Sequence, residues 1–320
     1  MLINHAPTRL PVELALLATL AFLWGASYTF IRIGVGTIPP VTLIAARTAM
    51  AGLLLLALMR LRGIALPRDR GVWGRLMVQA CLNSAVPFTL IAWAELTVEA
   101  GLATILNATT PVFAFLLSLA LARGQATDRR KLAGVVLGLA GICLIVGPGV
   151  LGGLGRDVAA QLAIVAATVC YAGAALFGRN FSGLHPMVPA AGSLICGAAL
   201  LIPLSLVVDR PWTLSPSPAS LGALLGLSVF STALAFVIYF RLIRTLGSVG
   251  TTAQAYLRVP FGVAIGMIFL GEQPTPTAWA GLAFVVLGVA AMTMPARAGA
   301  RVPAAQAAGD TAVAGIRRSA

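Results

Sequence analysis

Long apolar stretches dominate this chain, each close to the length at which a helix crosses a lipid bilayer. Hydrophobic residues make up 59% of its 320 residues and charged residues only 10%, whereas a soluble domain carries roughly 25% charged residues. A bilayer offers no water to an open backbone, so apolar stretches of about 20 residues cross it as helices. Ten such stretches are predicted, at 13–35, 41–61, 73–94, 98–121, 132–149, 158–179, 187–207, 219–240, 248–270 and 276–294. We therefore expect an all-α integral membrane protein with ten transmembrane helices.

The positions of the basic residues predict how the chain is oriented. The formal net charge of +13 would favour a nucleic-acid partner in a soluble domain. With ten spans, however, nearly every arginine and lysine falls on one side. The connections on the other side hold only Arg156 and Arg210, with Arg32 near that edge. By the positive-inside rule this asymmetry predicts a multi-pass protein of the inner membrane with both termini in the cytoplasm. No nucleic-acid partner is expected.

The two halves of the chain resemble each other. One fixed offset places Gly101 on Gly250 and Pro111 on Pro260. Each half carries five predicted spans, and an odd number means that the second copy enters the membrane in the opposite orientation. The sequence therefore predicts two inverted five-helix repeats, an arrangement typical of secondary transporters with a site near the midplane.

Composition divides the chain between and after these repeats. A glycine-rich stretch without helical periodicity separates the halves, and the last residues are alanine, glycine and arginine without an apolar face. The predicted parts are a first repeat over 1–147, a periplasmic linker over 148–157, a second repeat over 158–295 and a disordered cytoplasmic tail over 296–320.

Four segments carry a family resemblance. They are FLWGASYTFIRIG (22–34), PPVTLIAARTAMAGLLLL (39–56), GLATILNATTPVFAFLLSL (101–119) and VPFGVAIGMIFLGE (259–272). Together they resemble the EamA-domain branch of the drug/metabolite transporter superfamily. This resemblance implies a ten-helix inner-membrane carrier that works by alternating access, with a cavity between its halves.

Two positions depart from that pattern. Gln125 stands where the second half has Glu272, so only one copy keeps the Gly-Glu ending of the family. The small multidrug exporters of the superfamily use an acidic residue in their first span. Here that span has only Glu13, at its cytoplasmic edge, which argues against exchange of cationic drugs by that mechanism.

Arg258 is the sharpest candidate for substrate binding. It lies about ten residues into the ninth span, close to the middle of the bilayer. An arginine there costs roughly 2.5–3.5 kcal/mol on insertion scales, so it is expected to face a cavity or a partner. Its guanidinium can bind a carboxylate or a phosphate with two parallel hydrogen bonds. The structural alternative is a cluster of carbonyls or an acid that holds neighbouring helices together.

Other polar and aromatic residues lie deep in the spans and complete the candidate site. At the repeat offset Asn107 falls on Tyr256, so two polar side chains are expected at equivalent depths of inverted helices. Hydrogen bonds between helices, worth about 0.6 kcal/mol on average, are the structural alternative. The predicted substrate-binding residues are Arg258, Gln254, Tyr256, Asn107, Trp24, Tyr28, Tyr171 and Tyr239.

Pro111 and Pro260 occupy matched positions inside the fourth and ninth spans. Proline removes a backbone hydrogen bond and kinks a helix, so both are predicted hinges, with a purely architectural kink as the alternative. Arg47 is shallower, and snorkelling to the interface or a structural pairing is as good an expectation for it as substrate contact. Arg32, nearer the edge, is expected to be an anchor.

The acidic residues of the outer connections are expected to contact water. Glu95, Glu99 and Glu272 would then be poorly placed for proton coupling, because carriers use acids inside the membrane.

These patterns favour a secondary transporter that exports a small polar metabolite, such as an amino acid or a related carboxylate. The alternatives are an efflux carrier for lipophilic drugs or toxic compounds and a non-transporting membrane scaffold. A lipid-modifying enzyme would need a cluster of His, Asp or Glu near the interface, and an ATP-driven pump would need a phosphate-binding loop; the sequence has neither. We expect no enzyme activity, no catalytic residue, no metal and no cofactor. The expected partners are the small-molecule substrate and the lipid bilayer, and the chain is expected to be a monomer or a homodimer.

Overall fold

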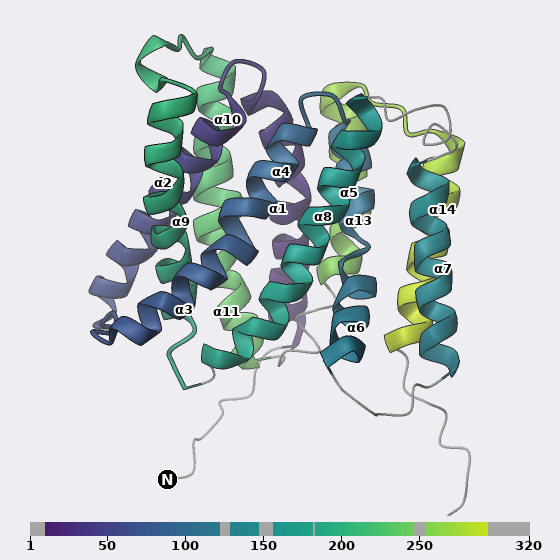
Figure 1. Ribbon diagram of the computed structural model, residues 1–320, viewed down its shortest axis with the longest axis horizontal. Coiled ribbons are helices and arrows are strands. Elements are labelled where there is room, and N and C mark those ends of the chain that lie inside the picture. Colours follow the sequence, from purple (N-terminus) through teal and green to yellow (C-terminus); the bar gives the residue numbers. More distant parts are fainter. Residues whose placement is uncertain (1–9, 122–128, 147–155, 182, 246–253, 294–320) are drawn as a thin grey trace, which may run out of the picture.

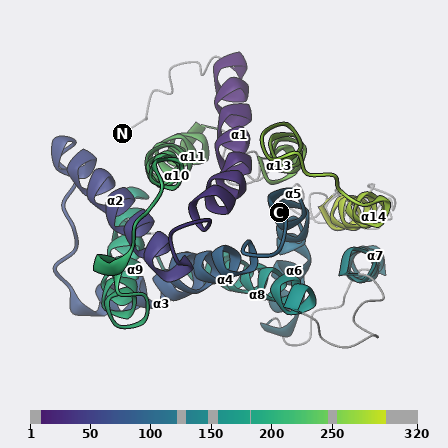
Figure 2. The same cartoon turned by 90° about the horizontal axis from the view of Figure 1, so that it is seen from above.

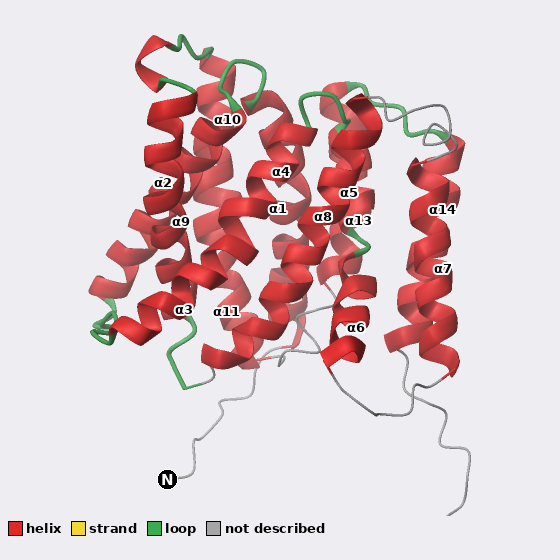
Figure 3. Cartoon of the chain, in the orientation of Figure 1, coloured by secondary structure: helices red, strands yellow, loops and turns green. Residues whose placement is uncertain are grey.

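A computed structural model describes residues 10–121, 129–146, 156–181, 183–245 and 254–293, except for some individual side chains within these ranges. Every α-helix, 3-10 helix and π-helix in these ranges belongs to one helical bundle (Figure 3), which confirms the all-α class. The first half contains α1 (Leu10–Gly34), α2 (Pro40–Leu61), α3 (Arg70–Ala80), η1 (Cys81–Ala85), α4 (Val86–Ala94), α5 (Ala100–Asn107), α6 (Thr110–Leu121) and α7 (Arg129–Val146). The second contains α8 (Arg156–Phe177), η3 (Gly178–Phe181), α9 (Met187–Val208), η4 (Pro211–Thr213), α10 (Pro218–Ser228), η5 (Val229–Leu234), α11 (Ala235–Thr245), α13 (Gln254–Leu270) and α14 (Pro276–Thr293).

Seven helices among the described residues are long and apolar enough to cross a membrane: Leu10–Gly34, Pro40–Leu61, Arg70–Ala94, Ala100–Ala120, Val158–Phe181, Met187–Val208 and Pro218–Tyr239. Three shorter apolar helices occupy the positions of the fifth, ninth and tenth predicted spans. Large apolar side chains also cover the outside of the bundle, among them Val207 and Ile268, which are 76% and 74% exposed. Surface of this kind suits lipid rather than water.

The last two residues of the linker predicted over 148–157 belong to a helix, and the linker itself stays a prediction. Helix α8 already begins at Arg156, and residues 147–155 lie outside the described part. The predicted tail over 296–320 lies outside it as well.

Corresponding helices of the two halves pack against each other in antiparallel pairs. Helix α7 lies along α14 at one edge of the bundle (Figures 1 and 2). A Cβ added to Gly141 would lie 2.7 Å from the carbonyl oxygen of Gly281, and one added to Gly288 would lie 2.5 Å from that of Gly134. Residue numbers therefore rise along one helix where they fall along the other, so the two helices run antiparallel. Glycines let two such backbones approach closely, as is common between membrane helices.

Helices α2 and α9 form a second antiparallel pair. The Thr42 hydroxyl lies 2.7 Å from the Ser205 hydroxyl near one end. Toward the middle of α2, Gly52 faces the backbone of α9 at Ile195. Asp209, just beyond α9, accepts hydrogen bonds from both the N–H and the hydroxyl of Thr42, at 2.8 and 2.7 Å. A carboxylate at this position stabilises the first turn of α2.

Two π-helical segments interrupt the third and eighth spans at the same depth of the repeat. Segment η1 covers Cys81–Ala85 and η5 covers Val229–Leu234. The offset that places Gly101 on Gly250 places Cys81 on Phe230, inside the second segment. Short π-helical turns in α-helices often mark functional sites. The repeat therefore preserves a local distortion as well as apolar periodicity.

The fourth span is broken in its middle, between α5 and α6. Pro111 has no N–H to donate to the carbonyl of Asn107, four residues earlier. The hydroxyl of Thr110 donates to that carbonyl instead, at 2.8 Å. Its counterpart Pro260 lies inside α13, which continues without a break from Gln254 to Leu270. The two matched prolines therefore have different local consequences in the two halves.

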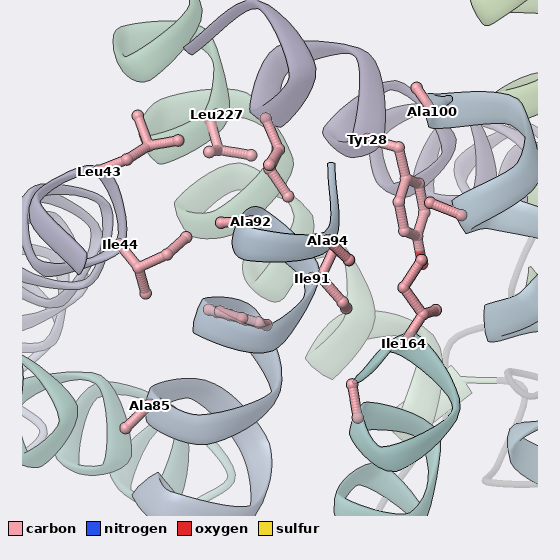
Figure 4. Close-up of a cluster of buried hydrophobic side chains, with 14 of the residues drawn as sticks. Tyr28, Leu43, Ile44, Ala85, Ile91, Ala92, Ala94, Ala100, Ile164 and Leu227 are labelled. Carbon is pink, nitrogen blue, oxygen red and sulfur yellow. The ribbon is translucent and has the colours of Figure 1, made fainter. Parts of the chain in front are cut away.

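The main hydrophobic core joins both halves. It includes fully buried residues of α2 and α10, such as Leu43, Ile44 and Leu227, and residues of α4 such as Ile91. Figure 4 shows part of this cluster, with Tyr28 of α1 among its members. Tyr28 therefore brings a hydroxyl into this apolar cluster.

Candidate functional site

Arg258 and Asn107 meet where the two halves face each other. One terminal nitrogen of the Arg258 guanidinium donates to the side-chain oxygen of Asn107 at 3.2 Å. Asn107 is 1% exposed and ends helix α5, and its Nδ2 has no hydrogen-bond partner in the described structure. The Nε of Arg258 is likewise buried and unpaired. Buried donors without partners cost free energy, so this pair keeps unused capacity for an acceptor.

A glycine positions Arg258 against the first helix. A Cβ added to Gly25 of α1 would lie 3.0 Å from the carbonyl oxygen of Arg258 and 2.9 Å from the N of Gly262. Only a residue without a side chain lets α1 approach α13 so closely. The depth of Arg258 in the bundle is therefore set by backbone contact between two helices.

Tyr28 and Tyr171 belong to the same interior cluster. Tyr28 is 3% exposed, and its hydroxyl lies beside the Asn107 side chain and interacts electrostatically with Arg258. Tyr171, on α8, interacts with Tyr28 and Arg258 in the same way. Four of the eight predicted residues, from α1, α5, α8 and α13, are thus brought together.

Arg47 is the site residue that sequence reasoning did not select. It is 5% exposed, which excludes snorkelling to the interface and leaves the two other interpretations, a structural pairing and substrate contact. Its Nε donates to the hydroxyl of Thr232 at 3.0 Å, and its guanidinium carbon lies 3.8 Å from the centre of the Phe88 ring. It also interacts electrostatically with Tyr28 and Tyr171. Arg47 therefore belongs to the interior cluster of Arg258.

The feature that orients Arg47 is a π-helical turn, which is visible only in the structure. Thr232 sits in the π-helical segment η5 and donates to the carbonyl of Leu227, five residues earlier, at 2.8 Å. Its hydroxyl oxygen is thereby turned to accept from Arg47. Propensity does not predict a π-turn at this position, because such turns are rare and short.

Trp24 and Tyr239 form a separate aromatic group between α1 and α11. Their ring centres are 5.5 Å apart, and Phe236 packs edge-on to Trp24 at 6.3 Å. Both belong to a second apolar cluster that contains Leu20 and is distinct from the main core. Of the five predicted aromatic residues, Trp24 and Tyr239 therefore pack against this second cluster, and Phe236 connects Trp24 to the main core.

The two remaining predicted residues lie at the start of α13. The side-chain oxygen of Gln254 is buried without a hydrogen-bond partner. Tyr256 falls within helix α13, but its side chain is outside the described residues. The equivalence of Asn107 and Tyr256 therefore stays a prediction.

The cluster carries unbalanced positive charge. In the part of the chain that the structure describes, the one ion pair within 4.0 Å joins Arg241 to Glu13, far from this cluster. Arg47, which is buried, and Arg258, which is partly buried, thus both lack a carboxylate at ion-pair distance in the described structure. A buried charge is stable only with a partner, and this arrangement can supply two guanidinium groups to an anion.

Glu272 ties the two halves together at the predicted outer end. Its two carboxylate oxygens accept the N–H groups of Ala100 and Gly101, the first residues of α5, each at 2.7 Å. The positive end of a helix dipole favours a carboxylate at this position. Glu272 is only 8% exposed, so the expectation that it contacts water is wrong.

The Gly-Glu ending of α13 has a geometric reason. Gly271 adopts φ of +68°, which glycine tolerates and other residues rarely do. This turn directs Glu272 back toward α5. A Cβ on Gly266 would lie 2.3 Å from one of its carboxylate oxygens, so glycine is needed at that position too.

The opposite end is closed by a different contact. The carboxylate of Glu13 on α1 accepts from Arg241 at 2.8 Å and from the Thr245 hydroxyl at 2.9 Å, both on α11. A cavity of about 260 Å³ lies beside it, with Arg62, His185 and Arg241 among its lining residues. The predicted cytoplasmic end therefore offers basic side chains at a small opening.

Comparison with known proteins assigns these features to a family. The model described as "EamA-like transporter family" matches twice, over residues 12–147 and 158–294. One solved crystal structure has a TM-score of 0.62 at 20% identity, covering 88% of this chain and 97% of its own. At that identity the likeness shows the fold alone.

Curated relatives are transporters by name. The "Uncharacterized inner membrane transporter YedA" of Escherichia coli strain K12 is 29% identical, over 89% of this chain and 91% of its own length. The "Probable terminal-alkyne amino-acid exporter" of Streptantibioticus cattleyicolor is 27% identical, over 83% of this chain and 88% of its own length. These names agree with a transporter rather than an enzyme.

Proposed function

Since the chain belongs to the EamA-like transporter family and is a multi-pass membrane transporter, we propose that it exports a small carboxylate-bearing metabolite such as an amino acid. The observation that carries this proposal is the pair of interior guanidinium groups, Arg47 and Arg258, without a carboxylate at ion-pair distance in the described structure. Guanidinium groups bind carboxylates with short, charge-assisted bonds. One relative is named as an amino-acid exporter, which supports the substrate class.

Alternating access between two inverted halves would move this substrate. The antiparallel contacts of α2 with α9, of α5 with α13 and of α7 with α14 support inverted repeats. In this scheme the halves comprise residues 1–147 and 158–295, with ten spans in the inner membrane and both termini in the cytoplasm. The Glu272 contact would close the outer end and the Glu13–Arg241 contact the inner end. The broken fourth span at Pro111, and Pro260 in the ninth, would bend as the halves rock.

A second candidate substrate is an anionic lipophile, as in the efflux of toxic compounds. The aromatic group of Trp24, Phe236 and Tyr239 favours it, because aromatic faces bind apolar bodies. This group borders α1, the helix that also carries Tyr28. Interior arginines would serve either substrate.

Counterflow in proteoliposomes tests the proposal without knowledge of the coupling ion. Vesicles loaded with pooled amino acids are diluted into labelled ones, with wild type beside Arg258→Ala and the control Arg68→Ala, an exposed arginine between α2 and α3. We expect uptake by wild type and Arg68→Ala. Loss of one or two charged hydrogen bonds should weaken binding by Arg258→Ala at least about tenfold.

Three other results would redirect the proposal. Equal uptake by wild type and Arg258→Ala would keep the carrier but remove Arg258 from its site. Uptake of lipophilic anions alone would favour the second candidate. Absence of any uptake by wild type would argue for another solute class or for a non-transporting scaffold.

A further inference from the structure

Glu95 is an acidic residue in an unusual place. It follows Ala94, the last residue of α4, in the connection to α5, where we expected contact with water. Instead its exposed fraction is 0%. Both carboxylate oxygens are buried without a hydrogen-bond partner in the described structure. Glu99, four residues later in the same connection, is exposed as expected, and Glu272 uses both of its oxygens.

Charged groups from three other segments surround Glu95. Arg32 of α1 donates to its main-chain carbonyl oxygen rather than to its carboxylate. This contact gives Arg32, expected to be an anchor, a partner in the connection between α4 and α5. Arg47 of α2, Tyr28 of α1 and Glu272 after α13 interact with Glu95 electrostatically. Two of these residues, Arg47 and Tyr28, belong to the interior cluster of the candidate site.

These surroundings favour the neutral form of Glu95. A buried carboxylate without hydrogen bonds is costly when ionised and far less so when protonated. Burial is the first cause that raises the pKa of this carboxyl well above its usual range, and the negative charge of Glu272 raises it further. Arg32 and Arg47 act in the opposite direction but more weakly than burial. A raised pKa means that the proton is retained as the pH rises through the ordinary range of a glutamic acid.

We propose that Glu95 is a proton-binding site of the transport cycle, and that its protonation is linked to the binding of an anionic substrate by Arg47 and Arg258. The linkage rests on the proposed function. Ionised Glu95 would attract the guanidinium of Arg47 and repel an incoming carboxylate, whereas neutral Glu95 leaves Arg47 to the substrate. Because linkage is reciprocal, a bound carboxylate also strengthens proton binding by Glu95.

The proton and the carboxylate therefore move together. When the Glu272 contact at α5 opens, water reaches Glu95, and its carboxyl transfers the proton to water as the substrate leaves. Only the O–H bond of Glu95 breaks, and it forms again when the empty site is reprotonated. A monocarboxylate transported in this way carries no net charge, so the membrane potential does not act on it, and its concentration gradient together with the pH gradient would set the direction of net transport.

Infrared spectroscopy of the reconstituted protein tests the proton site without any substrate. We compare wild type with Glu95→Gln, which resembles the neutral acid in shape, and with the control Glu99→Gln at the exposed neighbour. At neutral pH we expect the C=O band of a protonated carboxyl in wild type and Glu99→Gln, and its loss in Glu95→Gln. In Glu95→Asp the band should shift in frequency, which serves if the glutamine variant does not fold. A neutral-pH spectrum in which neither Glu95 variant changes this band would overturn the proposal.

The pH dependence of counterflow then tests the linkage. Above the titration midpoint of Glu95, the concentration of pooled amino acids that gives half-maximal counterflow by wild type should rise by up to about tenfold per pH unit. Glu95→Gln should show no such rise. Equal pH profiles in wild type and Glu95→Gln would overturn the linkage. If the band is present but wild type exchanges no amino acid at any pH, Glu95 stands as a proton site and the proposed substrate class fails.

Discussion

At the scale of single residues, the interior of this protein holds charge that a stable fold does not need. Arg47 is buried against a threonine hydroxyl and an aromatic ring, and Arg258 leaves one nitrogen unpaired. Groups that are costly to bury persist where function requires them. Removing one of these charges is therefore expected to lower transport without lowering the stability of the fold.

Arg47→Met makes this separation measurable. Methionine fills a similar volume without charge, so thermal stability should stay level or rise, since an unpaired buried charge is lost. Counterflow of pooled amino acids should fall at least about tenfold, because one guanidinium of the site is gone. Melting in detergent and counterflow are compared with wild type. Unchanged counterflow would assign Arg47 a structural role only.

Glu272→Gln tests the cap of α5. Its carboxylate accepts two backbone N–H groups, whereas glutamine offers one acceptor oxygen and an amide that cannot accept. Hydrogen bonds to charged groups contribute about 1.5–3 kcal/mol each, and we expect a loss of this order in chemical denaturation. The exposed Glu99→Gln should stay within about 0.5 kcal/mol of wild type. Equal stability of the two variants would contradict the cap.

At the scale of helices, glycine and proline decide how the spans meet and bend. Glycines bring α1 onto α13, and α7 onto α14, to backbone contact. Pro111 divides the fourth span into α5 and α6, next to the Asn107 side chain that receives Arg258. The same residues that shape the helices thus place the polar groups.

Gly25→Ala should disturb the site from a distance. Its added methyl group would lie 2.9–3.0 Å from backbone atoms of α13, at Gly262 and Arg258, so one helix must shift. We expect lower melting temperature and reduced counterflow. Gly222→Ala on α10 is the matched control, because its Cβ meets nothing within 4 Å. If both variants behave alike, the close approach of α1 and α13 is not critical.

Pro111→Ala tests the predicted hinge. Alanine supplies an N–H for the carbonyl of Asn107, which now accepts from Thr110, so the fourth span can become continuous. We expect stability to stay level or rise, since proline disfavours helix interiors, while the rate of counterflow falls. An unchanged rate would make the break an architectural kink.

At the scale of the whole molecule, the two ends of the bundle are held by different contacts between the halves. Carboxylates of the second half, Asp209 and Glu272, stabilise the first turns of α2 and α5 at one end. At the other end Glu13 of the first half pairs with Arg241. Each of these contacts joins the two halves. Opening one end therefore requires that the contacts of Asp209 and Glu272 break, and opening the other requires that the Glu13–Arg241 contact break.

The predicted orientation places the Glu13 end in the cytoplasm. Alkaline phosphatase is active only where its disulfides form, outside the inner membrane. A fusion after residue 295 should therefore be inactive, and an insertion into the linker between the halves should be active. The reverse pattern would invert the topology that we infer from the basic residues.

Much of the fold was readable from the chain because hydropathy reports the solvent of each helix. Apolar stretches predicted the membrane-capable helices, and the Gly101–Gly250 match predicted that the halves are repeats, which the twofold family match supports; their inverted orientation stays a prediction. The cost of an arginine in a bilayer was enough to single out Arg258, and the repeat offset was enough to include Asn107 in the candidate site. These inferences need only local composition and spacing.

Tertiary structure decided which of these residues share one environment. Trp24 and Tyr239 were predicted for the same site as Tyr28, yet they pack against a second cluster, because the face that each helix turns to its neighbours depends on packing with distant segments. Arg47 and Glu95 looked peripheral by position along the chain. Contacts with Thr232, Phe88 and Arg32, far away in sequence, are what bury them. Their burial depends on those distant contacts, which hydropathy does not report.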